Sequence, residues 1–111
     1  MALSSSLDAT ADGDGVRFVY TVTNDGEEPV KLSFRSGQSF DVLVDEGGDE
    51  RWRYSDGRMF TQVLRSETLE PGETKRYETT WEDPPAGDYQ ARAVLDRPDR
   101  SCEARTTVSV D

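Results

Sequence analysis

The sequence predicts an all-β fold, an immunoglobulin-like antiparallel β-sandwich of roughly seven to nine short strands. Apolar and polar side chains alternate at every second position in one segment after another, which is the period of a half-buried strand. Clusters of Gly, Pro, Asn and Asp separate these segments at short intervals. No helical pattern is longer than one turn. A closed barrel is the alternative arrangement, and in either case we expect one domain spanning residues 1–111.

The first third of the chain contains three predicted strands. Residues 3–11 alternate weakly, and the Asp-Gly-Asp-Gly run at 12–15 predicts a turn. Residues 16–23 show the clearest alternation, and the row expected to face the core is Val16, Phe18, Tyr20 and Val22. After a turn at 24–26, a shorter strand has the inward row Val30, Leu32 and Phe34.

The central stretch, residues 34–64, combines many aromatic side chains with several turns. It predicts a strand whose inward row is Phe40, Val42 and Val44. A hairpin at Gly47-Gly48 leads into a returning strand with Trp52 and Tyr54 on one face. A turn follows at Asp56-Gly57. Residues 60–65 fit either one helical turn or a segment that crosses between sheets, and both interpretations stay open.

The last third of the chain predicts three more strands. Residues 69–73 form a turn in which Pro71 and Gly72 occupy the positions that a type II turn requires. The strands that follow have the alternating rows Tyr77, Thr79, Trp81; then Tyr89, Ala91, Ala93, Leu95; then Cys102, Ala104, Thr106, Val108, Val110. A Pro-Pro-Ala-Gly break at 84–87 and a polar loop at 96–101 separate them.

The charge balance is strongly acidic. The chain has 23 Asp and Glu against 13 Lys and Arg, a net charge of −10, and only Lys31 and Lys75 are lysines. Molar salt reduces the Debye length to roughly 3 Å and screens the repulsion among such charges, so we infer an extreme halophile with a salty cytoplasm. The other interpretation is an acidic surface shaped for a basic partner, but the acids are scattered. Nucleic acid and anionic membrane are poor partners for this charge.

Catalysis and cofactor binding have little support. The chain contains no His, which removes the commonest general base, and Cys102 has the pattern of a small buried residue. Residues 8–13 resemble the start of a calcium loop, but Thr10 occupies its third position and Val19 its twelfth. We therefore expect no enzyme, no metal and no cofactor. The N-terminus has no signal-peptide pattern and no apolar run could span a membrane, so we expect a cytoplasmic protein.

Binding to another protein is the function that remains. Arg51, Arg53 and Arg58 lie close to Trp52, Tyr54, Met59 and Phe60, and these residue types are enriched at interface cores. The aromatic residues themselves are expected in the protein core, with Arg side chains paired to nearby acids. Met59 differs, because it follows Asp56-Gly57-Arg58 in a predicted turn.

Five elements of the sequence together resemble the BsuPI-type intracellular proteinase inhibitor family. They are Phe34-x-Ser36-Gly37-Gln38-x-Phe40-Asp41, Trp52-x-x-Ser55-x-Gly57-x-x-Phe60-x-Gln62, Leu69-x-Pro71-Gly72-Glu73, Trp81 and Gly87-x-Tyr89. The resemblance covers residues 16–95. It implies a cytoplasmic β-sandwich whose partner is a protein, a subtilisin-like serine protease that it inhibits. No inhibitory residue is transferred from the family.

The loop best suited to contact a protease consists of Asp56, Gly57, Arg58 and Met59. Our hypothesis is that Met59 enters an apolar specificity pocket while Trp52 and Phe60 brace the loop. The opposing interpretation is that Met59 fills the core. The loop at 96–101 is the second candidate. A non-inhibitory immunoglobulin-like module for protein binding or assembly is the alternative function, and an enzyme comes last.

Overall fold

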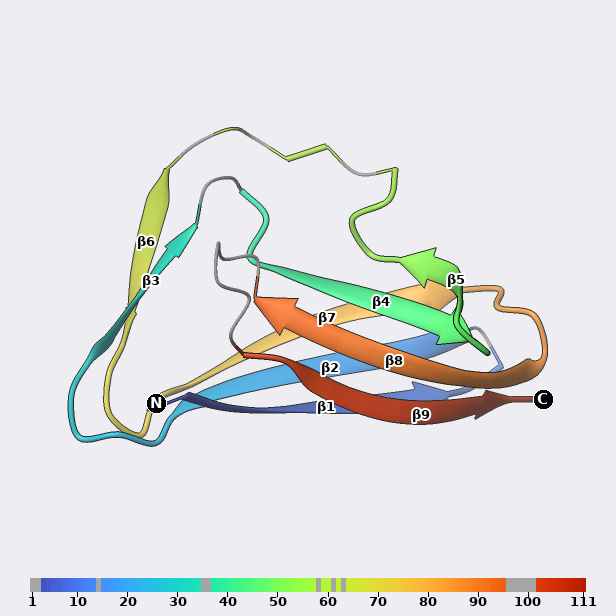
Figure 1. Cartoon of the computed structure of the whole chain (residues 1–111), viewed down its shortest axis with the longest axis horizontal. Helices are drawn as coiled ribbons and strands as arrows, with labels where there is room; N and C mark the ends of the chain where they lie inside the picture. Colours follow the sequence, from blue (N-terminus) through green and yellow to red (C-terminus); the bar gives the residue numbers. More distant parts are fainter. Residues whose placement is uncertain are drawn as a thin grey trace.

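The computed structural model describes residues 3–13, 15–34, 37–57, 59–60, 62, 64–95 and 102–111. These residues form nine strands and no helix, and every paired strand is antiparallel. The strands are β1 (Leu3–Ala11), β2 (Gly15–Asn24), β3 (Val30–Phe34), β4 (Phe40–Glu46), β5 (Asp49–Arg53), β6 (Arg65–Leu69), β7 (Thr74–Glu82), β8 (Gly87–Leu95) and β9 (Ala104–Val110). The all-β prediction is confirmed (Figure 1).

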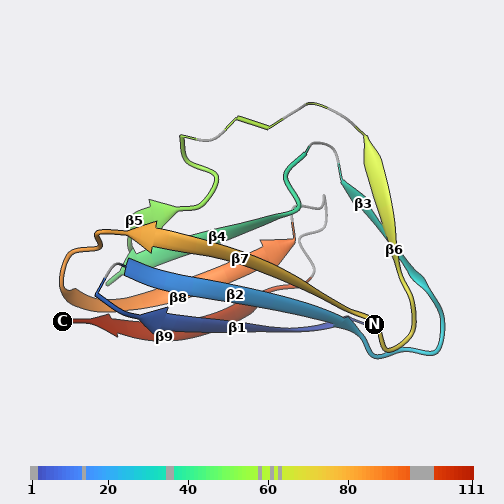
Figure 2. The same ribbon diagram turned by 180° about the vertical axis from the view of Figure 1, so that it is seen from behind.

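The described strands form three separate sheets. β1-β2-β7 is one sheet, β5-β4-β8-β9 is the second, and β3-β6 is a two-stranded ribbon. The four-stranded sheet lies in front of the three-stranded sheet in Figure 1 and behind it in Figure 2, with the ribbon at one end in both views. Because the strands form two facing sheets and not one closed sheet, the structure is a sandwich and the barrel alternative is wrong.

The core lies between the two larger sheets and follows the predicted alternation. The inward rows of β2 and β4 are buried, and they consist of Val16, Phe18, Tyr20, Val22, Phe40, Val42 and Val44. Trp52 of β5 stacks on Phe18 at 5.7 Å and on Trp81 at 6.0 Å between ring centroids. Since Phe18 and Trp81 belong to the opposite sheet, this aromatic stack joins the two layers.

Two predicted turns are confirmed. Residues 47–48 connect β4 to β5 as a two-residue hairpin loop. Gly72 has φ of 79°, and the Glu73 amide donates to the Glu70 carbonyl at 2.9 Å. This is a type II turn, in which the third position needs the positive φ that glycine adopts easily.

The strand β6 is the element that the sequence did not predict. The segment Arg-Ser-Glu-Thr-Leu has one apolar residue, Leu69, so its alternation is weak. Pairing with β3 supplies the missing stabilisation, because Val30 lies opposite Leu69 and the Arg65 guanidinium lies over the Phe34 ring at 4.6 Å. Residues 60, 62 and 64 have no regular secondary structure. They belong to a connection from the four-stranded sheet to the ribbon, so the crossing interpretation is confirmed and the helical turn is wrong.

Candidate functional site

The candidate site is the connection that follows β5. Residues 54–57 form a turn in which Asp56 and Gly57 are exposed, and Gly57 has φ of 77°. Met59 is 99% exposed, so the interpretation that it fills the core is wrong. Leu64, on the same connection, is 84% exposed, and these two are the exposed large apolar side chains of the described chain. Arg58 lies outside the described residues.

Aromatic rings connect this segment to the protein core. Tyr54 stacks on Phe40 with centroids 4.5 Å apart, and Phe60 packs against Tyr54 at 6.2 Å in a tilted arrangement. Phe40 in turn stacks on Tyr77 of the opposite sheet at 5.0 Å. Exposed Met59 is therefore next to a ring, that of Phe60, which is linked through Tyr54 to the core.

Hydrogen bonds hold the start of the turn against β4. The Tyr54 amide donates to the Val42 carbonyl at 2.9 Å, and the Asp56 amide donates to the Arg53 carbonyl at 3.1 Å. The Asp41 carboxylate accepts from the Ser55 amide at 3.1 Å and from the Ser55 hydroxyl at 2.8 Å. Asp41 and Ser55 thus fix the residue immediately before Asp56 without a disulfide.

Asp41 is the residue of the candidate site that sequence reasoning missed. It lies in the row of β4 that alternates with Phe40, Val42 and Val44, yet it is only 5% exposed. Its burial is compensated by a third hydrogen bond, from the Val42 amide at 2.9 Å, since a buried carboxylate needs partners. One signal could have found it: Asp41 and Ser55 both belong to the pattern that resembles the BsuPI family.

The two described arginines near the turn are paired with acids, as the core interpretation expected. Arg51 lies 3.1 Å from Glu46, and Arg53 lies 2.5 Å from Glu50. The hydrogen bond to Glu50 raises the pKa of Arg53. Below the loop, burial raises the pKa of Tyr77 to about 12.

The residues weighed above as metal ligands or as a reactive thiol lie in a strand, in a turn or in the core. Among the described residues, no group of three or more His, Cys, Asp or Glu could hold a metal ion. Asp8 and Thr10 belong to strand β1, and Asp12 accepts a hydrogen bond from the Gly15 amide at 3.1 Å, which is the role of a turn residue. Cys102 is buried. The second candidate loop, 96–101, lies outside the described residues.

Comparison with known families assigns the chain to one of them. A family model described as BsuPI, intracellular proteinase inhibitor, matches residues 3–99. The chain belongs to the BsuPI family. The match extends beyond residues 16–95, where the motif resemblance was noted. The BsuPI family consists of proteinase inhibitors and not enzymes, so the partner that the family implies is a protein, a proteinase, inside the cell. A search of curated proteins found no match.

Solved structures share the fold of this BsuPI-family chain at low identity. A CARDB domain from Pyrococcus furiosus matches with a TM-score of 0.56 and 19% identity over 98% of this chain and 94% of that one. The sporulation control protein Spo0M from Bacillus subtilis matches with a TM-score of 0.58 and 15% identity over 100% of this chain and 50% of that one. Beta-glucosidase 3B from Thermotoga neapolitana matches with a TM-score of 0.54 and 18% identity over 96% of this chain and 15% of that one.

These similarities show the fold alone. They support the immunoglobulin-like sandwich that the alternation predicted, and they leave the site to be argued from the chain itself. In the described residues, no helix is long and apolar enough to cross a membrane.

Proposed function

We propose that this BsuPI-family protein inhibits a subtilisin-like serine protease in the cytoplasm, and that the loop of Asp56, Gly57, Arg58 and Met59 contacts the enzyme. The supporting observation is the exposure of Met59, an apolar side chain that is 99% exposed on a connection held by Asp41 and by stacked rings. Removing such an apolar side chain from water lowers the free energy of the system, so its exposure favours binding of a partner that covers it.

Rigidity of the loop before binding supports the inhibitor role. A protein inhibitor of standard size buries roughly 1,600 Å² with its protease, and its affinity depends on how little freedom the loop loses. Here the two hydrogen bonds from Ser55 to Asp41 and the stacking of Tyr54 on Phe40 restrict the turn in the free protein. In small secreted inhibitors, disulfides commonly hold the binding loop rigid. This chain has only one cysteine, and these contacts restrict the loop in their place.

Met59 is the residue proposed to enter an apolar specificity pocket. Its unbranched side chain adapts to pockets of irregular shape, and full burial of such a side chain contributes roughly 1.5–3 kcal/mol. Leu64, exposed on the same connection, would supply a second apolar contact. The inhibitory unit in this proposal is one sandwich domain spanning residues 1–111, and its net charge of −10 suits a cytoplasm of molar salt.

The experiment is inhibition of a subtilisin-like serine protease in concentrated salt, with casein as the substrate. The wild-type chain is expected to slow casein cleavage at stoichiometric amounts and to stay intact itself. Met59→Asp is expected to weaken inhibition at least about tenfold, because an apolar contact is replaced by a charge that the pocket would desolvate. Gln62→Asp is the control, since it adds the same charge to the same connection. Equal inhibition by wild type and Met59→Asp would contradict the role of Met59.

The alternative is a non-inhibitory immunoglobulin-like module for protein binding or assembly. The observation in its favour is that the same fold occurs in a CARDB domain and in a protein named for sporulation control. A module of this kind would leave casein cleavage unchanged at every ratio of chain to protease, while capturing another protein from a cytoplasmic extract in concentrated salt.

A further inference from the structure

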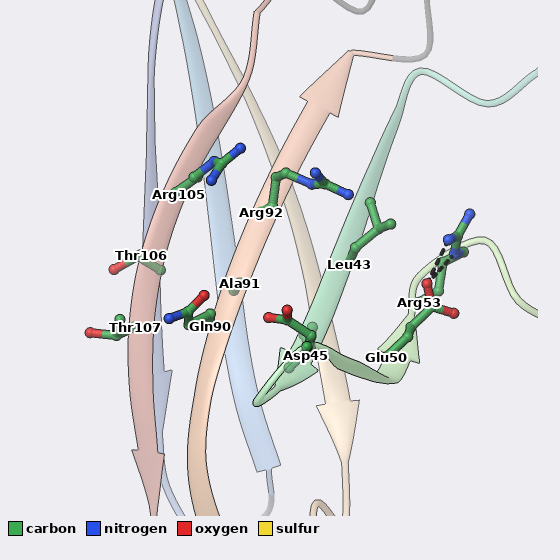
Figure 3. Close-up of a pocket in the computed structure, with 12 residues that line it drawn as sticks. Leu43, Asp45, Glu50, Arg53, Gln90, Ala91, Arg92, Arg105, Thr106 and Thr107 are labelled. Carbon is green, nitrogen blue, oxygen red and sulfur yellow. Dashed lines mark hydrogen bonds and ion pairs between the residues drawn. The ribbon is translucent and has the colours of Figure 1, made fainter.

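The outer face of the four-stranded sheet is hollowed by a cavity of about 670 Å³ (Figure 3). One row of side chains crosses this face from strand to strand. Leu43 of β4 lies opposite Arg53 of β5 and opposite Arg92 of β8, and Arg92 lies opposite Arg105 of β9. We call these four residues, Arg53, Leu43, Arg92 and Arg105, the arginine row.

The arginine row differs from the rest of the chain in charge. Acids outnumber bases by 23 to 13 in the sequence, but the row holds three arginines and no acid. Arg53 is paired with Glu50 and Arg105 with Glu103. Arg92 is exposed and makes no ion pair or hydrogen bond with any described residue. A cation without an acidic partner among the described residues is unexpected where acids are so abundant.

The register places two positive charges opposite each other, and a bound anion would reduce the repulsion between them. Like charges placed directly opposite on neighbouring antiparallel strands destabilise the pair, and Arg92 stands directly opposite Arg105. A carboxylate between two guanidinium groups accepts charge-assisted hydrogen bonds from both. Figure 3 shows Arg92 and Arg105 on adjacent strands of one face, with Leu43 on the next strand.

The adjacent row limits what can bind. One step along the strands, Glu50, Asp45, Gln90 and Thr107 line the same cavity, and the first two are acids. A uniformly polyanionic ligand would therefore meet repulsion beside the arginine row. A ligand with separate carboxylates and apolar groups fits better, because Leu43 lies between Arg53 and Arg92 and is only half-buried.

We propose that Arg92 and Arg105, together with Leu43, bind a segment of a partner protein that carries Asp or Glu side chains. The cavity is large enough for several side chains, and the half-buried Leu43 opposite Arg92 offers an apolar contact that a small free anion would not use. Nucleic acid is disfavoured because a uniform polyanion would meet Asp45 and Glu50 beside the arginine row. This interaction does not depend on Met59 or on inhibition of a protease.

The experiment is an NMR titration of the full, isotope-labelled chain with a short capped peptide of alternating Glu and Ala. The matched peptide of alternating Gln and Ala is the first control. We expect shifts at Leu43, Arg92, Arg105 and their strand neighbours but not at Met59, and we expect weaker binding as salt rises over a range in which the chain stays folded. Arg92→Gln is expected to weaken binding about tenfold or more, since a hydrogen bond to a charged group is lost.

Arg76→Gln is the control variant, because Arg76 is an exposed arginine on β7 of the other sheet. Equal affinity for the Glu and Gln peptides, or equal loss in Arg92→Gln and Arg76→Gln, would overturn the proposal. Acetate giving the same shifts at the same carboxylate concentration would mean that the row holds an adventitious ion only. Self-association that Arg92→Gln abolishes would mean that the occupant is a second copy, which also overturns it.

Discussion

The inner and outer faces of β4 contrast sharply. On the inner face Phe40, Val42 and Val44 are all buried, as alternation predicts for a strand that covers a core. On the outer face the order is inverted, since the polar Asp41 is buried and the apolar Leu43 is half-exposed. The first of these exceptions holds the proposed inhibitory loop, and the second lies in the arginine row. Departures from alternation in this strand thus coincide with the residues proposed to act.

The largest expected effect is on the inner face. Phe40→Ala removes a ring that stacks on Tyr54 and Tyr77, and it is expected to lower the free energy of unfolding by about 3–5 kcal/mol. Urea denaturation at constant high salt measures the change. Leu43→Ala on the outer face is the matched control and should cost less than about 1 kcal/mol, because Leu43 is only half-buried. Similar losses in both variants would remove the distinction between the two faces.

The next effect tests the buried acid of the outer face. Asp41→Ala leaves the Ser55 amide without its partner and is expected to cost about 1–3 kcal/mol. Amide exchange at Ser55 should become faster by more than global unfolding explains, because the turn loses its attachment to β4. Asp45→Ala, on the same face of the same strand, is the control. If Asp45→Ala had an equal effect on Ser55 exchange, Asp41 would have no special role.

The smallest effect concerns a buried polar group that has no hydrogen-bond partner among the described residues. The Tyr77 hydroxyl is buried and makes no hydrogen bond with described residues, whereas the Tyr20 hydroxyl donates to the Cys102 carbonyl. Tyr77→Phe is therefore expected to raise the free energy of unfolding by roughly 1 kcal/mol, and Tyr20→Phe to lower it by a similar amount. Thermal denaturation at neutral pH compares the two, and a loss in Tyr77→Phe would contradict the expectation.

The same tyrosine gives a pH dependence of known sign. Burial raises the pKa of Tyr77 to about 12 in the folded protein, above the value near 10 of an exposed tyrosine. The unfolded chain therefore loses its proton first as the pH rises, and stability falls between about pH 10 and pH 12. Burial also raises the pKa of Tyr20, so the fall should shrink in Tyr77→Phe without disappearing. A fall of unchanged size in that variant would show that Tyr77 does not contribute.

Much of the fold could be predicted from local pattern. The inward rows of β2 and β4 and the type II turn at Gly72 follow from alternation and from backbone preferences that a few neighbouring residues determine. Strand β6 could not, because its polar segment is a strand only through pairing with β3, which is distant in sequence. For the site, the position of Met59 in a turn suggested exposure, but the burial of Asp41 depends on Ser55, fourteen positions later.

The stack of Trp52 on Trp81 has a practical consequence. The chain has only two tryptophans, one in each layer of the sandwich, and their rings lie 6.0 Å apart and nearly parallel, at 20°. Two indoles this close couple their electronic transitions, so the circular dichroism spectrum should contain an exciton couplet that exists only while both layers are in register. That optical signal would report closure of the molecule directly, without any label.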